Sequence, residues 1–429
     1  MSATSDVTAR RGWYHGWNIV AACALSQAMA NGLPVNAFTL FLQDWSTELH
    51  APISSLQLGL AALGIFSSVF APFVGVLVDR KPARLLMGGG LLGIALFDIG
   101  ISFVTTTWQF LALYIVVLPA GVVFSTSLPA NAIVSRWFVR RLGLALGLTA
   151  FGLGLAGVVL PPLIAALLPL GWRTIWRMMG IFIGLVVAPI VVWVLRDRPT
   201  DRDGLHYLTP DNTTRPQVSH AIGGGDGGLG WRDILARRNF WLLVVAFLPM
   251  LALYGGCAHN LAPIGAGLGL SRQAVGVLLS VFSLSHVGST LMAGLLSDRF
   301  GNRLPLVGLA TATALGGIIV ATAANATGLT IGTALVGLSG GMWPLLAAAI
   351  AREFGASGVG RGFGLLTLFV PIIVFTPFIV AKVRETTGSY SLALGGLAVL
   401  TLAGAAACFL FMRERAIEQT LAPVSVARG

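Results

Sequence analysis

The sequence predicts an all-α polytopic membrane protein with twelve transmembrane helices, arranged as two six-helix bundles. Three observations predict this fold class. Of the 429 residues, 56% are hydrophobic and 10% are charged, and the mean hydropathy is +0.85. Soluble globular domains do not have this composition. Apolar segments of roughly 20 residues, long enough to cross a hydrocarbon core about 30 Å thick, recur along the chain. A short pattern occurs once in each half.

Short connections separate most of the twelve apolar segments. The segments are residues 17–43, 53–78, 85–104, 108–135, 142–168, 174–195, 239–266, 273–297, 304–324, 327–350, 362–382 and 390–412. One long polar stretch divides them into two sets of six, and its glycine-rich part is typical of a flexible linker. We therefore expect a first bundle over residues 1–200, a cytoplasmic linker over 201–234 and a second bundle over 235–429.

The repeated pattern is Gly-x-Leu-x-Asp-Arg-x-x-x-Arg, and its two copies lie 219 residues apart. They span Gly75 to Arg84 and Gly294 to Arg303. Each copy places a glycine near a helix end, where a neighbouring helix can approach closely, followed by a carboxylate and arginines where the chain leaves the bilayer. Internal duplication in a membrane protein is typical of transporters.

The distribution of positive charge decides between a membrane and a nucleic acid as partner. The net charge is +11 and the pI is near 10.7. If the N-terminus is cytoplasmic, 22 of the 27 Lys and Arg residues fall in cytoplasmic loops and tails. This asymmetry follows the positive-inside rule and predicts that both termini are cytoplasmic. The basic residues do not cluster with interleaved aromatics, which excludes nucleic-acid binding. We expect an integral protein of the cytoplasmic membrane, with the lipid bilayer as its surroundings.

Enzymatic function and bound cofactors are not expected. Cys23, Cys257 and Cys408 lie singly in apolar segments, which favours small core residues over disulfides or metal ligands. The apolar segments contain no paired carboxylates and no Cys/His cluster, and no Ser/His/Asp set falls in one compartment. We therefore predict no catalytic site, no metal and no cofactor.

The paired pattern and the twelve segments resemble the major facilitator superfamily over nearly the whole chain. This resemblance implies that Asp79 faces the start of helix 11 near Arg361, and Asp298 the start of helix 5 near Arg141. A carboxylate at a helix N-terminus is stabilised by about 0.3–1 kcal/mol, and the contact exists in only one of two packing states. We expect a conformational latch made of Gly75, Asp79, Arg80, Arg84, Arg141, Gly294, Asp298, Arg299, Arg303 and Arg361. The alternative is that these charges only anchor loops at the interface.

A narrower resemblance rests on the run from Trp137 to Leu148, which is followed by Gly152. This run, WFVRRLGLALGL, is similar to the helix 4–5 signature of the monocarboxylate transporter branch, which includes oxalate–formate antiporter-like proteins. In that branch a basic residue on helix 1 and an Asp and Arg on helix 8 hold the substrate. The corresponding positions here are Asn36, His286 and Thr290. A carboxylate would therefore lack a bidentate arginine partner.

Polar residues in apolar segments identify the expected substrate cavity, because such groups face protein or water rather than lipid. The resemblance places helices 1, 4, 7 and 10 around this cavity. Its predicted residues are Asn31, Asn36, Asn131, Tyr254, His259, Asn260, His286, Thr290 and Trp343. We expect His286 to bind substrate or to couple its movement to protons, because histidine titrates near neutral pH. The alternative is a buried neutral histidine bonded to a helix neighbour.

The expected function is secondary active transport of a small, monocarboxylate-like organic acid by alternating access. The substrate partner is then an organic anion, and the proton is the expected coupling ion. Efflux of a drug or metabolite is the alternative. The missing basic residues favour efflux, whereas helix 5 lacks the Gly-Pro-x-x-Gly-Gly run that is typical of drug-efflux antiporters. We expect a monomer.

Overall fold

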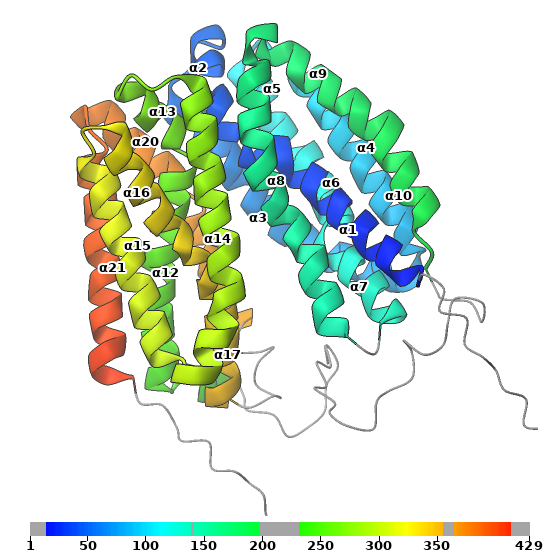
Figure 1. Ribbon diagram of the computed structural model, residues 1–429. Helices are drawn as coiled ribbons and strands as arrows, with labels where there is room; N and C mark the ends of the chain where they lie inside the picture. Colours follow the sequence, from blue (N-terminus) through cyan, green and yellow to red (C-terminus); the bar gives the residue numbers. More distant parts are fainter. Residues whose placement is uncertain are drawn as a thin grey trace, which may run out of the picture. The chain divides into compact units, whose positions relative to one another are not determined.

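The structure is a computed structural model that describes residues 14–138, 141–197, 231–354, 362, 364–366 and 368–412. The side chains of Asp79 and Asp298 lie outside this description. All regular structure in the described ranges is helical (Figure 1). The predicted linker, residues 201–234, falls almost entirely outside these ranges, and only its last four residues are described.

The described helices of the first half follow the predicted segments closely. They are α1 (Gly16–Asn31), η1 (Gly32–Asn36), α2 (Phe38–Glu48), α3 (Ile53–Arg80), α4 (Ala83–Ile101), α5 (Thr107–Ala112), η2 (Leu113–Val117), α6 (Leu118–Ser125), α7 (Ser127–Trp137), α8 (Leu142–Leu167), η3 (Leu168–Leu170), α9 (Trp172–Phe182), η4 (Ile183–Val187) and α10 (Ala188–Val194).

The second half has the same alternation of long and interrupted helices. They are α11 (Trp231–Leu235), α12 (Arg238–Ala258), α13 (Leu261–Gly267), α14 (Arg272–Phe300), α15 (Arg303–Thr322), α16 (Ala326–Gly337), η7 (Leu338–Gly341), α17 (Met342–Phe354), α19 (Val370–Ile373), α20 (Thr376–Thr387) and α21 (Ser391–Phe411). The repeated pattern begins near the ends of α3 and α14. The next helices, α4 and α15, begin 220 residues apart, close to the spacing of the repeat.

Eleven helical runs in the described residues are long and apolar enough to cross a membrane. The segment predicted at 17–43 is also helical, but it is divided into α1, the π-helix η1 and α2. Pro34 lies in η1 and cannot donate a backbone hydrogen bond, and Ala37 is not helical. Because α1 has 16 residues and α2 has 11, neither spans a bilayer alone.

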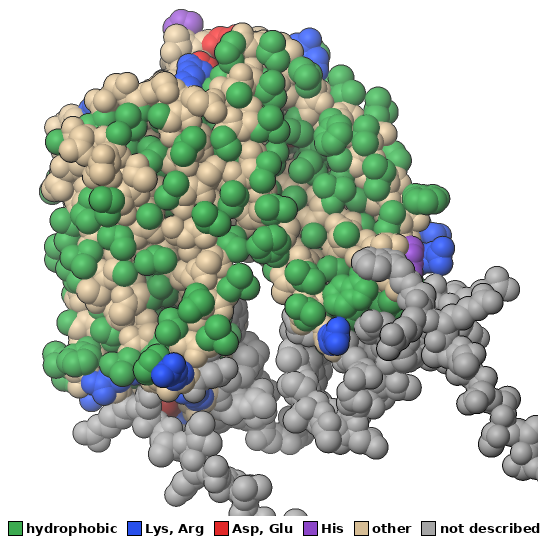
Figure 2. Space-filling model, viewed as in Figure 1, with side chains coloured by type: hydrophobic (Ala, Val, Ile, Leu, Met, Phe, Trp, Pro, Cys, Tyr) green, Lys and Arg blue, Asp and Glu red, His purple; other side chains and the backbone are tan. Residues whose placement is uncertain are grey.

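The outer surfaces of the helices are apolar, and the charged side chains lie at the helix ends (Figure 2). Trp193 on α10 is 84% exposed and Leu185 in η4 is 75% exposed. Large apolar side chains in such positions are expected only where hydrocarbon replaces water. The chain is therefore an integral multi-pass membrane protein, as the composition predicts.

Contacts divide the chain into two compact units. Unit 1 comprises residues 1–218, 258–284 and 377–390, and unit 2 comprises 219–257, 285–376 and 391–429. Unit 1 thus holds the first-half helices together with α13, the first part of α14 and nearly all of α20. The boundary passes through α14 between Leu284 and Ser285. Second-half helix ends therefore pack with first-half helices.

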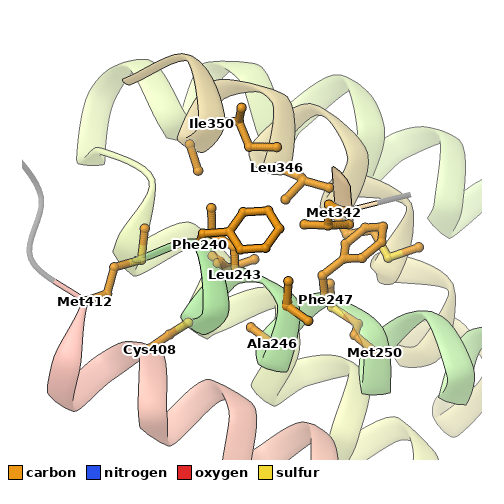
Figure 3. Packing of buried hydrophobic residues seen from close by; sticks show 14 of the residues in the cluster. Phe240, Leu243, Ala246, Phe247, Met250, Met342, Leu346, Ile350, Cys408 and Met412 are labelled. Atoms are coloured by element: carbon orange, nitrogen blue, oxygen red, sulfur yellow. The ribbon is translucent and has the colours of Figure 1, made fainter. Parts of the chain in front are cut away.

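Each unit has its own packed interior. In unit 2, Phe240 and Phe247 of α12 pack with Met342 and Leu346 of α17 and with Cys408 of α21 (Figure 3). In unit 1, Trp45 of α2 is fully buried in an aromatic cluster with Phe38, Phe41, Phe110, Trp172 and Trp176.

Small residues set the closest helix contacts, as expected where no hydrophobic force drives association in lipid. A Cβ added at Gly152 of α8 would lie 2.4 Å from the carbonyl oxygen of Ala24 on α1. One added at Gly404 of α21 would lie 2.5 Å from the carbonyl oxygen of Val245 on α12. Backbone meets backbone at both places, so a larger residue cannot fit without moving a helix.

Candidate functional site

The break in helix 1 positions two predicted cavity residues of unit 1. The Asn31 side-chain amide at the end of α1 donates to the carbonyl oxygen of Gln27 at 3.2 Å. Asn36 ends η1, and its Nδ2 atom is buried without a hydrogen-bond partner among the described residues. A Cβ added at Gly157 of α8 would lie 3.6 Å from this Nδ2. Asn36 thus keeps a free donor beside α8.

Sequence reasoning missed Gln27, although an amide within the first apolar segment was visible. Gln27 is 2% exposed, and its Nε2 donates to the carbonyl oxygen of Thr149 on α8 at 3.2 Å. Its Oε1 accepts a hydrogen bond of 3.2 Å from Ser127 of α7. Ser127 and Asn131 are one helical turn apart and both exposed on α7. Gln27 therefore ties α1 to α7 and α8 next to a polar face.

The seventh predicted segment, residues 239–266, which we call helix 7, breaks at two predicted cavity residues, His259 and Asn260, between α12 and α13. The break exposes backbone groups, and first-half side chains satisfy them. The carbonyl oxygen of His259 accepts from Nε2 of Gln57 on α3 at 2.7 Å. The backbone N–H of Ala262 donates to the hydroxyl oxygen of Thr39 on α2 at 3.2 Å.

Asn260 is fully buried within this contact region of unit 1. Its Oδ1 accepts from Gln57 at 3.3 Å, and its Nδ2 donates to the carbonyl oxygen of Pro377 on α20 at 3.3 Å. The His259 ring is half-buried and packs edge-on against Phe38, with ring centroids 6.5 Å apart. The amide of Asn260 is therefore committed to holding helix ends together.

Unit 2 brings His286 and Tyr254 into contact. Their ring centroids are 5.2 Å apart, with His286 in the middle of α14 and Tyr254 on α12. The Nδ1 atom of His286 is buried and has no hydrogen-bond partner in the described part of the chain. A Cβ added at Gly340 would lie 2.7 Å from the imidazole Cγ. The imidazole is thus held by packing against an aromatic ring and a glycine.

The other two predicted residues of unit 2, Thr290 and Trp343, make different contacts. Thr290 donates its hydroxyl to the carbonyl oxygen of His286 at 2.8 Å, one turn back along α14. The ring of Trp343, at the start of α17, meets Phe247 edge-on at 4.9 Å between centroids. Thr290 therefore serves its own helix, whereas Trp343 is part of an aromatic wall.

The predicted latch is described only in part. The side chains of Asp79 and Asp298, Gly294 and all of Arg361 lie outside the described residues, so their pairing stays a prediction. An added Cβ at Gly75 would meet nothing within 4 Å among the described residues, and the close helix approach expected there stays a prediction.

The described arginines of the predicted latch each make different contacts. The Arg84 guanidinium lies 3.6 Å from the Asp197 carboxylate, beyond the end of α10, and Arg299 lies over the ring of Phe300. Arg80 and Arg141 are exposed, and Arg141 precedes α8 with a φ of 57°. The Arg303 guanidinium lies over the Phe409 ring and donates to the backbone carbonyl oxygen of Phe409.

Two further arginines form a duplicated contact that sequence reasoning missed. Arg136 of α7 donates to the carbonyl oxygen of Val78 at 3.4 Å, and Arg352 of α17 donates to that of Ser297 at 3.0 Å. Val78 and Ser297 each immediately precede the aspartate of the repeated pattern. The contact was predictable in principle, because both arginines lie at matching places in the two halves.

The family model described as Major Facilitator Superfamily matches residues 20–264 and 258–426. The chain belongs to the major facilitator superfamily. It is therefore a membrane transporter and not an enzyme, as the sequence predicted.

Similar proteins include transporters of several substrates. The chain is 27% identical to monocarboxylate transporter 13 of Bos taurus over 92% of this chain and 88% of that one. It is 26% identical to a probable L-galactonate transporter of Escherichia coli over 83% of each. It is 25% identical to the oxalate:formate antiporter of Oxalobacter formigenes over 66% of this chain and 64% of that one.

A solved structure shares the fold. It is a bacterial homologue of the human lysosomal transporter Spinster, in an inward-facing and unoccupied conformation. The TM-score is 0.72 at 15% identity, covering 92% of this chain and 96% of the other. This likeness confirms the predicted all-α fold of the superfamily.

Proposed function

We propose that this transporter moves a small, monocarboxylate-like organic acid together with a proton. The observation that carries the proposal is the helix 4–5 run from Trp137 to Leu148, which resembles the monocarboxylate transporter branch. Relatives named for oxalate, formate, galactonate and monocarboxylates support it, since all of these are carboxylates. A riboflavin transporter of Trypanosoma brucei brucei, 29% identical over 47% of this chain, shows that the similarity extends to other substrates.

The proposed binding groups are almost all uncharged. They are the predicted cavity residues Asn31, Asn36, Asn131, Tyr254, His286 and Trp343. An ionised carboxylate that leaves water without a charged partner loses many kcal/mol of solvation. With no arginine among the proposed groups, the carboxylate takes a proton with it. The proton resides on the acid itself or on the imidazole of His286. In the first case the bound acid is neutral, and in the second the carboxylate and the imidazolium together carry no net charge.

The proposed movement is alternating access, with the halves 1–200 and 235–429 rocking about the site. The predicted latch at Asp79 and Asp298 then favours one packing state over the other. We further propose that both termini are cytoplasmic, that the protein resides in the cytoplasmic membrane and that it acts as a monomer.

The test is a thermal-stability screen of the purified protein in detergent. Small carboxylates are compared with neutral and cationic compounds, because a ligand that binds only the folded state raises its apparent stability. We expect carboxylates to raise the melting temperature, and to do so less at high pH. His286→Ala removes the shift, whereas His50→Asn, an exposed site with a φ of 50°, keeps it. Equal shifts in both variants contradict the role of His286.

Efflux of a drug or metabolite is the second candidate. Asn36, His286 and Thr290 replace the charged residues that the monocarboxylate branch has at these positions, which favours efflux because bulky neutral compounds need no arginine partner. If only bulky neutral or cationic compounds raise the melting temperature, the organic-acid proposal fails and efflux replaces it.

A further inference from the structure

Helix α3 begins with a cap that comes from far along the chain. Its N-cap residue, Pro52, provides no side-chain hydrogen bond. Instead, Oε1 of Glu385 on α20 accepts from the backbone N–H of Ser54 at 2.9 Å, and its Oε2 accepts from the Ser54 hydroxyl at 2.8 Å. A carboxylate in this position satisfies free backbone donors and complements the helix dipole. Residues 331 positions apart are thus joined at a helix start.

Helix α14, the counterpart of α3 in the second half, has a similar contact at its start. It begins at Arg272, 219 residues after Ile53, which is the spacing of the repeat. The Arg272 guanidinium meets the Asp44 carboxylate of α2 in a bidentate pair, with N–O distances of 2.5 and 2.6 Å. Bidentate arginine–carboxylate pairs are among the strongest hydrogen-bonded contacts in proteins. In both repeats, a carboxylate from the other sequence half meets the first turn of this helix.

The helix 7 break lies in the same contact region of unit 1. Gln57, one turn into α3 from Ser54, satisfies the carbonyl oxygen of His259, and Thr39 satisfies the N–H of Ala262. These backbone groups have no partner within their own helices, since α12 ends before them and α13 has just begun. Separation of these segments would leave them without these protein partners, at a cost for each buried group.

We propose that Asp44 and Glu385 form a latch that holds the start of α14 and the end of α20 against the first-half helices, and that opens when this end of the transporter opens. We call it the far-end latch. It is distinct from the predicted latch at Asp79, which is 25 residues along α3 from Ser54, about 38 Å at 1.5 Å per residue. The two latches thus lie at opposite ends of the same helix, suited to stabilising opposite states of alternating access.

A similar contact within the first half serves as the matched control. Arg173 of α9 pairs with Glu48 of α2 at 2.7 Å, and Glu48 lies four residues after Asp44 on the same helix. Both ends of this pair belong to the first half, so breaking it weakens unit 1 without releasing any second-half segment. Loss of a latch therefore lets first-half and second-half helix ends separate, whereas loss of the Arg173–Glu48 pair does not.

The experiment measures distances between spin labels on the full chain in lipid nanodiscs. Labels at Thr47→Cys and Thr386→Cys, both exposed, report on the separation of α2 and α20. The native cysteines, Cys23, Cys257 and Cys408, are buried, and the chain without added cysteines gives the background. We expect Glu385→Gln and Asp44→Asn to raise the long-distance population at least threefold, and Glu48→Gln to leave it unchanged.

A charge exchange separates the latch from general damage. The double variant Asp44→Arg with Arg272→Asp restores the pair with reversed polarity, and we expect it to return the distance distribution toward that of the parent. The proposal is overturned if Glu385→Gln and Asp44→Asn leave the distribution unchanged, or if Glu48→Gln changes it equally. Because no substrate is added, the outcome does not depend on the proposed organic acid.

Discussion

Arg173 is a charged side chain of unit 1 with several hydrogen bonds, and its removal is a quantitative test of the structure. Its guanidinium donates to Glu48 at 2.7 Å, to the carbonyl oxygen of Ser102 at 2.6 Å and to that of Val104 at 2.9 Å. It also lies 4.4 Å from the centroid of the Trp172 ring. Arg173 therefore joins the end of α2 and the loop after α4 to the start of α9.

The expected loss can be estimated from these contacts. Hydrogen bonds to charged groups contribute about 1.5–3 kcal/mol each when buried. Arg173 is 29% exposed and Glu48 is 45% exposed, so solvent screens much of this. We expect Arg173→Ala to cost about 2–4 kcal/mol, mostly because two carbonyl oxygens lose their donor. Arg173→Lys, which keeps the charge but not the planar fork, should cost about half as much.

The pH dependence of this contact has a definite sign. Partial burial alone would raise the pKa of Glu48, but hydrogen bonds from Arg173 and Trp172 outweigh it and hold the pKa below its usual range. A depressed pKa in the folded state gives stability that is present above the unfolded value, about 4.3, and is lost as pH falls through the folded value. Thermal unfolding in detergent, followed from pH 3 to 7, measures this. Equal melting temperatures for Arg173→Ala and its parent throughout this range would refute the reasoning.

Three further predictions follow from individual contacts. Gly404→Val, which pushes a side chain into a backbone carbonyl of α12, should cost about 1–3 kcal/mol by overpacking. A Cβ at Gly147 would meet no atom of the described residues within 4 Å, so Gly147→Val should melt like its parent. Gln27→Leu leaves a backbone carbonyl and a serine without their partner, and should cost about 1–3 kcal/mol in a chemical denaturation assay; no change would mean that the α1–α7–α8 tie is dispensable. Asp79→Asn should alter transport and the accessibility of the two membrane sides to cysteine reagents, and unchanged values of both would remove the latch hypothesis.

The fold was largely predictable because its signals are local. The length of each apolar segment and the sequence within each copy of the repeated pattern depend on neighbouring residues only. The predicted segment at 273–297 accordingly lies within α14, Arg272–Phe300. Pro34 in the first segment indicates an interruption of that helix. The form of the interruption, the π-helix η1 rather than a simple kink, depends on how Pro34 and its neighbours pack.

The site was predictable only as a set of polar positions. The sequence marks Asn260 and His286 as costly residues in apolar segments, but it does not indicate their partners. Asn260 contacts Gln57, 203 residues away, and Glu385 meets Ser54 across 331 residues. Such pairs depend on how helices from different halves meet, which a single sequence does not contain. The contact of His286 with Tyr254 likewise depends on the packing of α12 against α14.

The most direct test of the central proposal is transport by the purified protein in liposomes. An inwardly directed proton gradient is imposed, and uptake of radiolabelled lactate, formate or oxalate is measured. The proposal predicts that the gradient drives accumulation of at least one of these acids, that dissipating the gradient abolishes it, and that His286→Ala greatly reduces it. Functional liposomes that exchange a bulky neutral or cationic compound but accumulate none of these acids would contradict proton-coupled transport of a small organic acid.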